Sequence, residues 1–148
     1  MLPPYKYSNK MKEAFSEEPM TNITIPSCIN DQHQKYINSL IDYAKSQLKL
    51  TELPEIILTD DRNDAPMTTG SYIPEENKLF IYVKNRALCD YLRTIAHELV
   101  HVKQHLEDRI PSDLQGRNKE LEAEANIAAG DIIYDFAHKD ENQSIYDL

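Results

Sequence analysis

The stretch from Leu88 to Leu106 carries the strongest helical pattern in the chain and restricts the fold most. Six apolar residues follow one another in it at intervals of four, three, four, three and four positions: Leu88, Leu92, Ile95, Leu99, Val102 and Leu106. At about 100° per residue, these six side chains cluster on one face of a helix. We therefore expect a long amphipathic helix here, with one buried stripe and an opposite face turned away from it.

The pentapeptide HELVH occupies residues 97–101 of this helix. If Leu88 is set at 0°, the apolar stripe centres near about 10°, while His97 and His101 fall at about 180° and 220°. The two imidazoles therefore project together, one turn apart, on the side away from the stripe. Side chains at positions i and i+4 are close enough to bind one ion, and zinc suits imidazole. Glu98 lies beside that face, where it can act as the general base of a metal-dependent hydrolase.

A third ligand would distinguish a metal site from two histidines that merely share a polar helix face. His105 continues the row, but it lies roughly 12 Å from His97 along the helix axis and cannot reach the same ion. The extended motif of metzincins needs a glycine and a histidine where this chain has Gln104 and Glu107. That class of metallopeptidase is therefore excluded, and a third ligand must come from elsewhere in the chain.

A further helix is expected from about residue 118 to 138, and three glutamates near its start are candidate ligands: Glu120, Glu122 and Glu124. Its apolar stripe consists of Leu121, Ala125, Ala128, Ile132 and Phe136. If Leu121 is set at 0°, the stripe centres near about 20°, Glu124 falls at about 300° and Glu122 at about 100°, on opposite shoulders. Small residues around Glu124 would let this helix approach the histidine helix closely. The pattern therefore favours Glu124 and leaves Glu120 and Glu122 open.

The remaining sequence predicts one more helix and a small sheet. An amphipathic helix is expected at residues 31–49, and β-rich runs follow at 55–59, 70–73 and 78–83. The last two runs are separated by the turn sequence Pro74-Glu75-Glu76-Asn77 and should pair as a hairpin. The order of helix, three strands, helix and helix predicts an α+β fold, with a small three-stranded sheet packed beside the helices.

The ends of the chain and its composition bear on the cellular setting. Residues 1–30 are expected to form an irregular N-terminal arm without a signal-peptide core, and residues 139–148 a polar C-terminal tail. No apolar run approaches the roughly 20 residues that span a bilayer. A net charge of −9, without a cluster of basic residues, argues against nucleic acid as a partner. The sequence therefore predicts a cytoplasmic protein without nucleic-acid or membrane partners.

The histidine motif and the glutamate helix together resemble the gluzincin metallopeptidases, in which HExxH is completed by a glutamate on a following helix. Here HELVH is followed by ELEAEANIAA at residues 120–129. Within it Glu124-Ala125-Asn126, with Ala129 after it, is similar to the second motif of the small ImmA/IrrE-type metallopeptidases and of the minigluzincins. The resemblance implies a minimal zincin fold, forming a metallopeptidase domain over residues 31–138.

Carried over residue by residue, the resemblance implies that His97, His101 and Glu124 bind one zinc ion. Glu98 would take a proton from water activated by the metal, in a zinc-dependent endopeptidase that hydrolyses peptide bonds of protein or peptide substrates. The alternative is a catalytically silent zinc-bound module of the same fold that acts as a binding or structural protein. The presence of Glu98 favours the enzyme.

The family pattern also bears on the choice of the third ligand, on the strand that aligns the substrate and on the residue that steadies the oxyanion. Many gluzincins have an aspartate four positions after the metal-binding glutamate, whereas here Ala128 follows Glu124 at that distance. Glu120, which has Glu124 four positions later, and Glu122, which also precedes an alanine, therefore stay open as ligands. The strand at residues 79–83 resembles the edge strand that aligns an extended substrate in this family. Candidates for steadying the oxyanion are His105, Tyr134, His138 and Tyr82.

Overall fold

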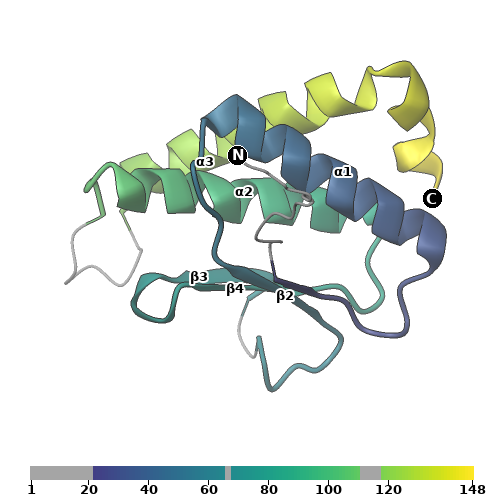
Figure 1. Cartoon of the computed structure of the whole chain (residues 1–148), viewed down its shortest axis with the longest axis horizontal. Coiled ribbons are helices and arrows are strands. Elements are labelled where there is room, and N and C mark those ends of the chain that lie inside the picture. Colours follow the sequence, from purple (N-terminus) through teal and green to yellow (C-terminus); the bar gives the residue numbers. More distant parts are fainter. Residues whose placement is uncertain (1–21, 66–67, 111–117) are drawn as a thin grey trace, which may run out of the picture.

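The structure is a computed structural model that describes residues 22–65, 68–110 and 118–148. In this part of the chain, α-helices lie over one face of a small four-stranded sheet (Figure 1), which confirms the predicted α+β class. The helices are α1 (Asp31–Leu48), α2 (Leu88–Leu106) and α3 (Lys119–Ala137). The strands are β1 (Ile23–Thr24), β2 (Glu55–Thr59), β3 (Gly70–Ile73) and β4 (Lys78–Tyr82). Helix α2 occupies the centre, since it contacts α1, α3, β3 and β4.

The sheet has the strand order β1-β2-β4-β3, so β3 forms one edge and β4 is internal. Strand β2 pairs in parallel with β1 and with β4, and β3 pairs antiparallel with β4 across the predicted hairpin. The prediction of three strands is wrong, because Ile23–Thr24 from the expected arm pairs with β2 as a fourth strand. A two-residue strand is too short for a period-two pattern to reveal it in the sequence.

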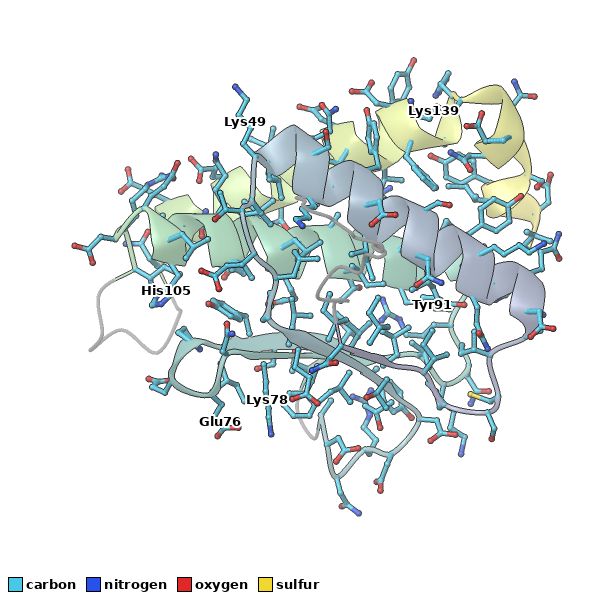
Figure 2. The ribbon with its side chains drawn as sticks, in the orientation of Figure 1. Lys49, Glu76, Lys78, Tyr91, His105 and Lys139 are labelled. Carbon is cyan, nitrogen blue, oxygen red and sulfur yellow. The ribbon has the colours of Figure 1, made fainter. Side chains whose placement is uncertain are left out.

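The core lies between the sheet and the helices. Alternate residues of the two central strands face it and are at most 1% exposed: Ile56, Leu58, Leu79 and Ile81. Figure 2 shows side chains filling this layer, with Tyr91 of α2 among them. The Tyr91 hydroxyl lies 2.7 Å from Nδ1 of His33 and so links α2 to α1.

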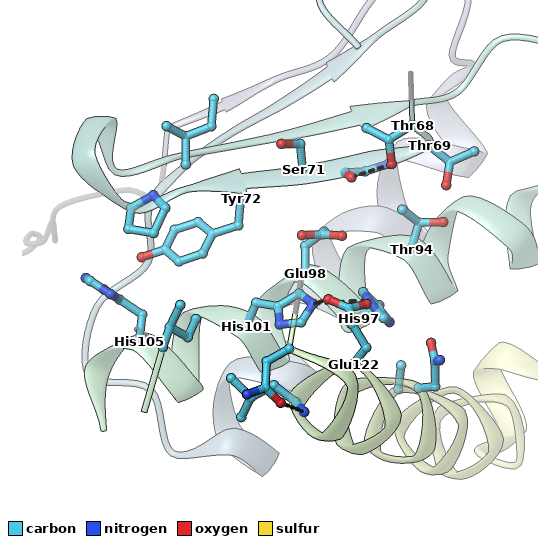
Figure 3. A pocket seen from close by; sticks show the side chains of 18 of the residues that line it. Thr68, Thr69, Ser71, Tyr72, Thr94, His97, Glu98, His101, His105 and Glu122 are labelled. Carbon is cyan, nitrogen blue, oxygen red and sulfur yellow. Dashed lines mark hydrogen bonds and ion pairs between the residues drawn. The ribbon is translucent and has the colours of Figure 1, made fainter. Parts of the chain in front are cut away.

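The predicted apolar stripe of α2 is buried over five of its six positions, Leu88, Leu92, Ile95, Leu99 and Val102. The sixth, Leu106, is 51% exposed because the helix ends at this residue. The opposite face of α2, which carries His97 and His101, is turned toward β3 and the start of α3 (Figure 3).

The C-terminal residues, which were predicted to form a polar tail, pack against the helices α2 and α3. Residues Asp140–Asp147 form a 3-10 helix, in which Ile145 is fully buried and Asn142 donates to the Phe136 carbonyl at 3.0 Å. The amide of Leu88 donates to the carbonyl of Leu148 at 3.4 Å. Among the described residues, no helix has the length and apolarity needed to cross a membrane.

Candidate metal centre

Figure 3 shows two imidazoles of α2 and one carboxylate of α3 pointing toward one another. Oε1 of Glu122 is 3.2 Å from Nε2 of His97, and Oε2 is 2.9 Å from Nε2 of His101. The two Nε2 atoms are 3.2 Å apart. One carboxylate therefore bridges both imidazoles, and four potential donor atoms for a cation lie within one small volume.

Glu124, the glutamate expected to join the histidines, is held elsewhere. Both terminal nitrogens of Arg109 donate to its carboxylate at 2.9 Å, and Nε2 of Gln104 donates to it at 2.8 Å. The hydrogen bonds from Arg109 and Gln104 lower the pKa of Glu124. Glu120 is exposed at the start of α3. The structure therefore does not bring Glu124 to the histidines: of the three candidate glutamates, it places Glu122 beside the imidazoles.

The difference follows from which face of α3 is buried. Four residues of the expected stripe are buried, Leu121, Ala125, Ile132 and Phe136, and the core also takes in Ala129, Ile133 and Ala137, which are at most 5% exposed. Ala128 is only partly buried. At about 100° per residue, the buried face then centres near about 70° from Leu121. Glu122, at about 100°, falls on that face, whereas Glu124 lies about 130° away from its centre.

Glu98 is the buried acid of the site. Its side chain is only 7% exposed, and burial, followed by the negative charge of Glu122, raises its pKa to about 8. Potential ligand atoms of His97, Glu98 and His101 all lie within 4.8 Å of one another. A proton on this carboxyl therefore sits next to the point where the imidazoles meet.

Each imidazole also has a second polar partner. Nδ1 of His101 lies 2.7 Å from Oε1 of Gln104, and the side chain of Asn126 lies beside His97 in the same cleft. Burial and the neighbouring His101 lower the pKa of His97, and the contacts with Glu122 and Asn126 partly offset this. Sequence reasoning missed Gln104 and Asn126. Asn126 stands four positions after Glu122, so the family interval would have identified it once Glu122 was chosen.

A cleft of about 1040 Å³ runs between β3 and the helices α2 and α3, and the candidate site lies in it (Figure 3). Strand β3 packs closely against α2 at Gly70. A Cβ atom there would lie 2.6 Å from Cγ2 of Thr94 and 3.1 Å from Oε2 of Glu98. Toward one end, the rings of Tyr72 and His105 meet edge to face with centroids 5.9 Å apart. The cleft therefore brings a strand edge, a buried acid and the histidine pair together.

The cleft is flanked by a different edge strand from the one expected, and one of the four oxyanion candidates lines it. The edge strand beside it is β3, so the assignment of that position to residues 79–83 is wrong: β4 is flanked by β2 and β3. Of the four candidates for steadying an oxyanion, His105 lines the cleft. Tyr82, Tyr134 and His138 are not among its lining residues.

The chain matches no protein-family model, no curated protein and no solved structure in the comparisons made with each. The donor atoms, the buried acid and the cleft are therefore the observations from which a function is inferred.

Proposed function

We propose that the protein is a zinc-dependent endopeptidase of the gluzincin type with a minimal zincin fold. In this proposal His97, His101 and Glu122 hold one zinc ion, and Glu98 is the general base. The observation that carries it is the convergence of both Nε2 atoms and the Glu122 carboxylate, with contacts of 2.9–3.2 Å. The order of helix, sheet, histidine helix and glutamate helix supports the same assignment.

The donor set fits zinc in chemistry and in spacing. Imidazole nitrogens and carboxylate oxygens are common zinc ligands. Two ligands at the usual distance of about 2.0–2.1 Å from zinc stand about 3.3 Å apart at a tetrahedral angle. The observed donor contacts are 2.9–3.2 Å, so only small side-chain shifts would be needed to admit the ion. Three protein ligands leave a fourth position for water or substrate.

Glu98 lies near the same point and has to be distinguished from Glu122 as a ligand. Glu122 contacts both imidazoles directly, whereas Glu98 is buried against β3 near Gly70. With its pKa raised to about 8, the Glu98 carboxyl is suited to holding and moving a proton near neutral pH. We therefore assign metal binding to Glu122 and proton transfer to Glu98.

A zinc ion at this site would lower the pKa of a coordinated water molecule and polarise a substrate carbonyl group. Glu98 accepts the proton of the attacking water and delivers it to the departing amine. For this step Glu98 must be ionised, a form that burial disfavours and a neighbouring cation favours.

The edge strand supports an extended peptide as the substrate. Among the described strands, β3 pairs on one side only, with β4, and its residues line the cleft beside Glu98. An extended chain can add to such an edge through backbone hydrogen bonds. That placement would bring a peptide carbonyl alongside the histidine pair.

Zinc content of four proteins tests the ligand set: wild type, Glu120→Ala, Glu122→Ala and Glu124→Ala. We expect about one zinc per chain in all of them except Glu122→Ala, because Glu122 is the one of these three glutamates that contacts the imidazoles. The two neighbouring substitutions remove the same group from the same helix turn and serve as matched controls. Loss of zinc in Glu124→Ala with retention in Glu122→Ala would reverse the assignment.

Cleavage of casein, an unstructured protein, tests the activity. Wild type should cleave it in a chelator-sensitive manner, and Glu98→Gln should keep zinc while losing nearly all cleavage, since an amide cannot accept the proton. If wild type binds zinc at the three ligands but cleaves neither casein nor other unfolded proteins, the silent zinc-bound module replaces the enzyme.

A further inference from the structure

Gln104 joins the histidine helix to the glutamate helix and is completely buried. Its Nε2 donates to the carbonyl oxygen of Leu121 at 3.0 Å and to Oε1 of Glu124 at 2.8 Å. Its Oε1 lies 2.7 Å from Nδ1 of His101. One side-chain amide therefore contacts the backbone of α3, the Glu124 carboxylate that is paired with Arg109, and the candidate metal ligand His101.

The partners of Gln104 fix which way its amide faces. A backbone carbonyl and an ionised carboxylate only accept hydrogen bonds, so the NH2 group must face Leu121 and Glu124. Glu124 is kept ionised by the paired hydrogen bonds from Arg109, both 2.9 Å long. The amide oxygen is left to face His101. Since an amide oxygen only accepts, His101 has to donate to it from Nδ1.

We propose that Gln104 is a positioning residue that keeps a proton on Nδ1 of His101, so that Nε2 is the nitrogen offered to the cation. Nε2 is the atom that lies 2.9 Å from Glu122 and 3.2 Å from Nε2 of His97. Gln104 also fixes the plane of the ring, because its oxygen and the site lie on opposite sides of the imidazole. Glu124 and Arg109 act through Gln104 by holding its amide in this orientation.

The consequence for zinc affinity rests on the proposed metal centre, whereas the tautomer of His101 is a property of the protein itself. Substitution of a group that supports a histidine ligand typically weakens metal binding by about 10–100-fold. Gln104→Met replaces the amide with an apolar chain of similar length, and zinc affinity should fall by about that factor. Glu124→Gln should have a smaller effect, because the Leu121 carbonyl still orients the Gln104 amide.

The tautomer is measured in metal-free Glu122→Ala, a background that removes the carboxylate in contact with Nε2 of His101. Long-range ¹H–¹⁵N spectra are recorded at pH 8, above the range in which histidine usually titrates. His101 is assigned by the signal that disappears in His101→Gln. We expect a proton on Nδ1 in Glu122→Ala, and a shift toward the Nε2-protonated form when Gln104→Met is added.

The exchange Q104E/E124Q, also in the Glu122→Ala background, provides a variant that keeps an acceptor facing Nδ1 and a donor on α3. It should retain the proton on Nδ1, and it decides the matter if Gln104→Met fails to fold. A proton on Nε2 of His101 in Glu122→Ala itself, or in the exchange variant, overturns the proposal. So does an unchanged tautomer in a folded Gln104→Met variant. If the expected tautomers are observed but wild type does not cleave casein, the peptidase proposal is contradicted and the proposed role of Gln104 is retained.

Discussion

At the scale of single residues, the ionised form of Glu98 that the proposed reaction needs is the form that lowers the stability of the fold. Its pKa is about 8 in the folded protein, compared with an ordinary value of 4.5. Between these two pH values the folded state keeps a proton that the unfolded state has lost. The folded state therefore binds more protons at this residue, and the contribution of Glu98 to the free energy of unfolding of the metal-free protein falls as pH rises from 4.5 to about 8. Above that range the contribution of Glu98 is constant.

The substitution Glu98→Gln should remove this pH-dependent penalty. We expect metal-free Glu98→Gln to exceed wild type in free energy of unfolding by on the order of 3 kcal/mol at pH 8, with a much smaller difference near pH 5. Urea unfolding at both pH values measures it. Glu120→Gln, which neutralises an exposed carboxylate on α3, is the control and should show no such dependence. Parallel pH profiles for wild type and Glu98→Gln would contradict the buried state of this acid.

Sequence reasoning identifies site residues where the geometry is local. His97, Glu98 and His101 share one helix, so the helical period alone brings them together. Glu122 depends on how α3 is rotated against α2, and the alanine-rich α3 has no strong stripe to fix that rotation. In the sequence, Gln104 stands out only because the metzincin motif has a glycine at its position. Its contacts with His101 and Leu121 depend on how α2 and α3 pack together, which the sequence does not show.

At the scale of elements, the helices and the β3–β4 hairpin were predictable, since their patterns and turn are local in sequence. Strand β1 and the C-terminal 3-10 helix were not, because each is held by residues distant in the chain. The close approach of β3 to α2 is also non-local. It depends on Gly70, where even one methyl group would contact Thr94 and Glu98.

Gly70→Ala should therefore destabilise the protein and disturb Glu98. A Cβ atom 2.6 Å from Cγ2 of Thr94 requires β3 or the side chain to move, at a cost of about 1–3 kcal/mol in free energy of unfolding. Gly130→Ala is the matched control: its Cβ would come no closer than 3.8 Å, to Nη1 of Arg93. Since alanine favours helix, Gly130→Ala should stabilise by up to about 1 kcal/mol.

Urea unfolding and casein cleavage compare the two glycine variants. We expect Gly70→Ala to lose both stability and activity, and Gly130→Ala to retain activity. A Gly70→Ala protein as stable and active as wild type would show that β3 does not approach α2 as closely as the structure has it.

At the scale of the whole molecule, the candidate ligands belong to two different helices. His97 and His101 belong to α2, and Glu122 to α3. In the metal-free protein the three side chains hold each other through a carboxylate that bridges two imidazoles. A zinc ion bound to all three would cross-link α2 to α3 only in the folded state, because unfolding separates the ligands. Zinc binding would then act directly on the folding equilibrium.

Zinc should therefore raise the free energy of unfolding in proportion to the logarithm of its concentration. At a free zinc concentration about 100 times the dissociation constant, the increase should be about 2.7 kcal/mol, and a chelator should reverse it. Thermal or urea unfolding across a zinc titration measures the increase. Glu120→Ala should respond like wild type, since Glu120 is exposed at the start of α3 and has no part in the proposed centre. Glu122→Ala should respond weakly, because the histidines alone remain. Equal responses of wild type and Glu122→Ala would mean that zinc does not connect the two helices, and that the zinc ligands do not include Glu122 of α3.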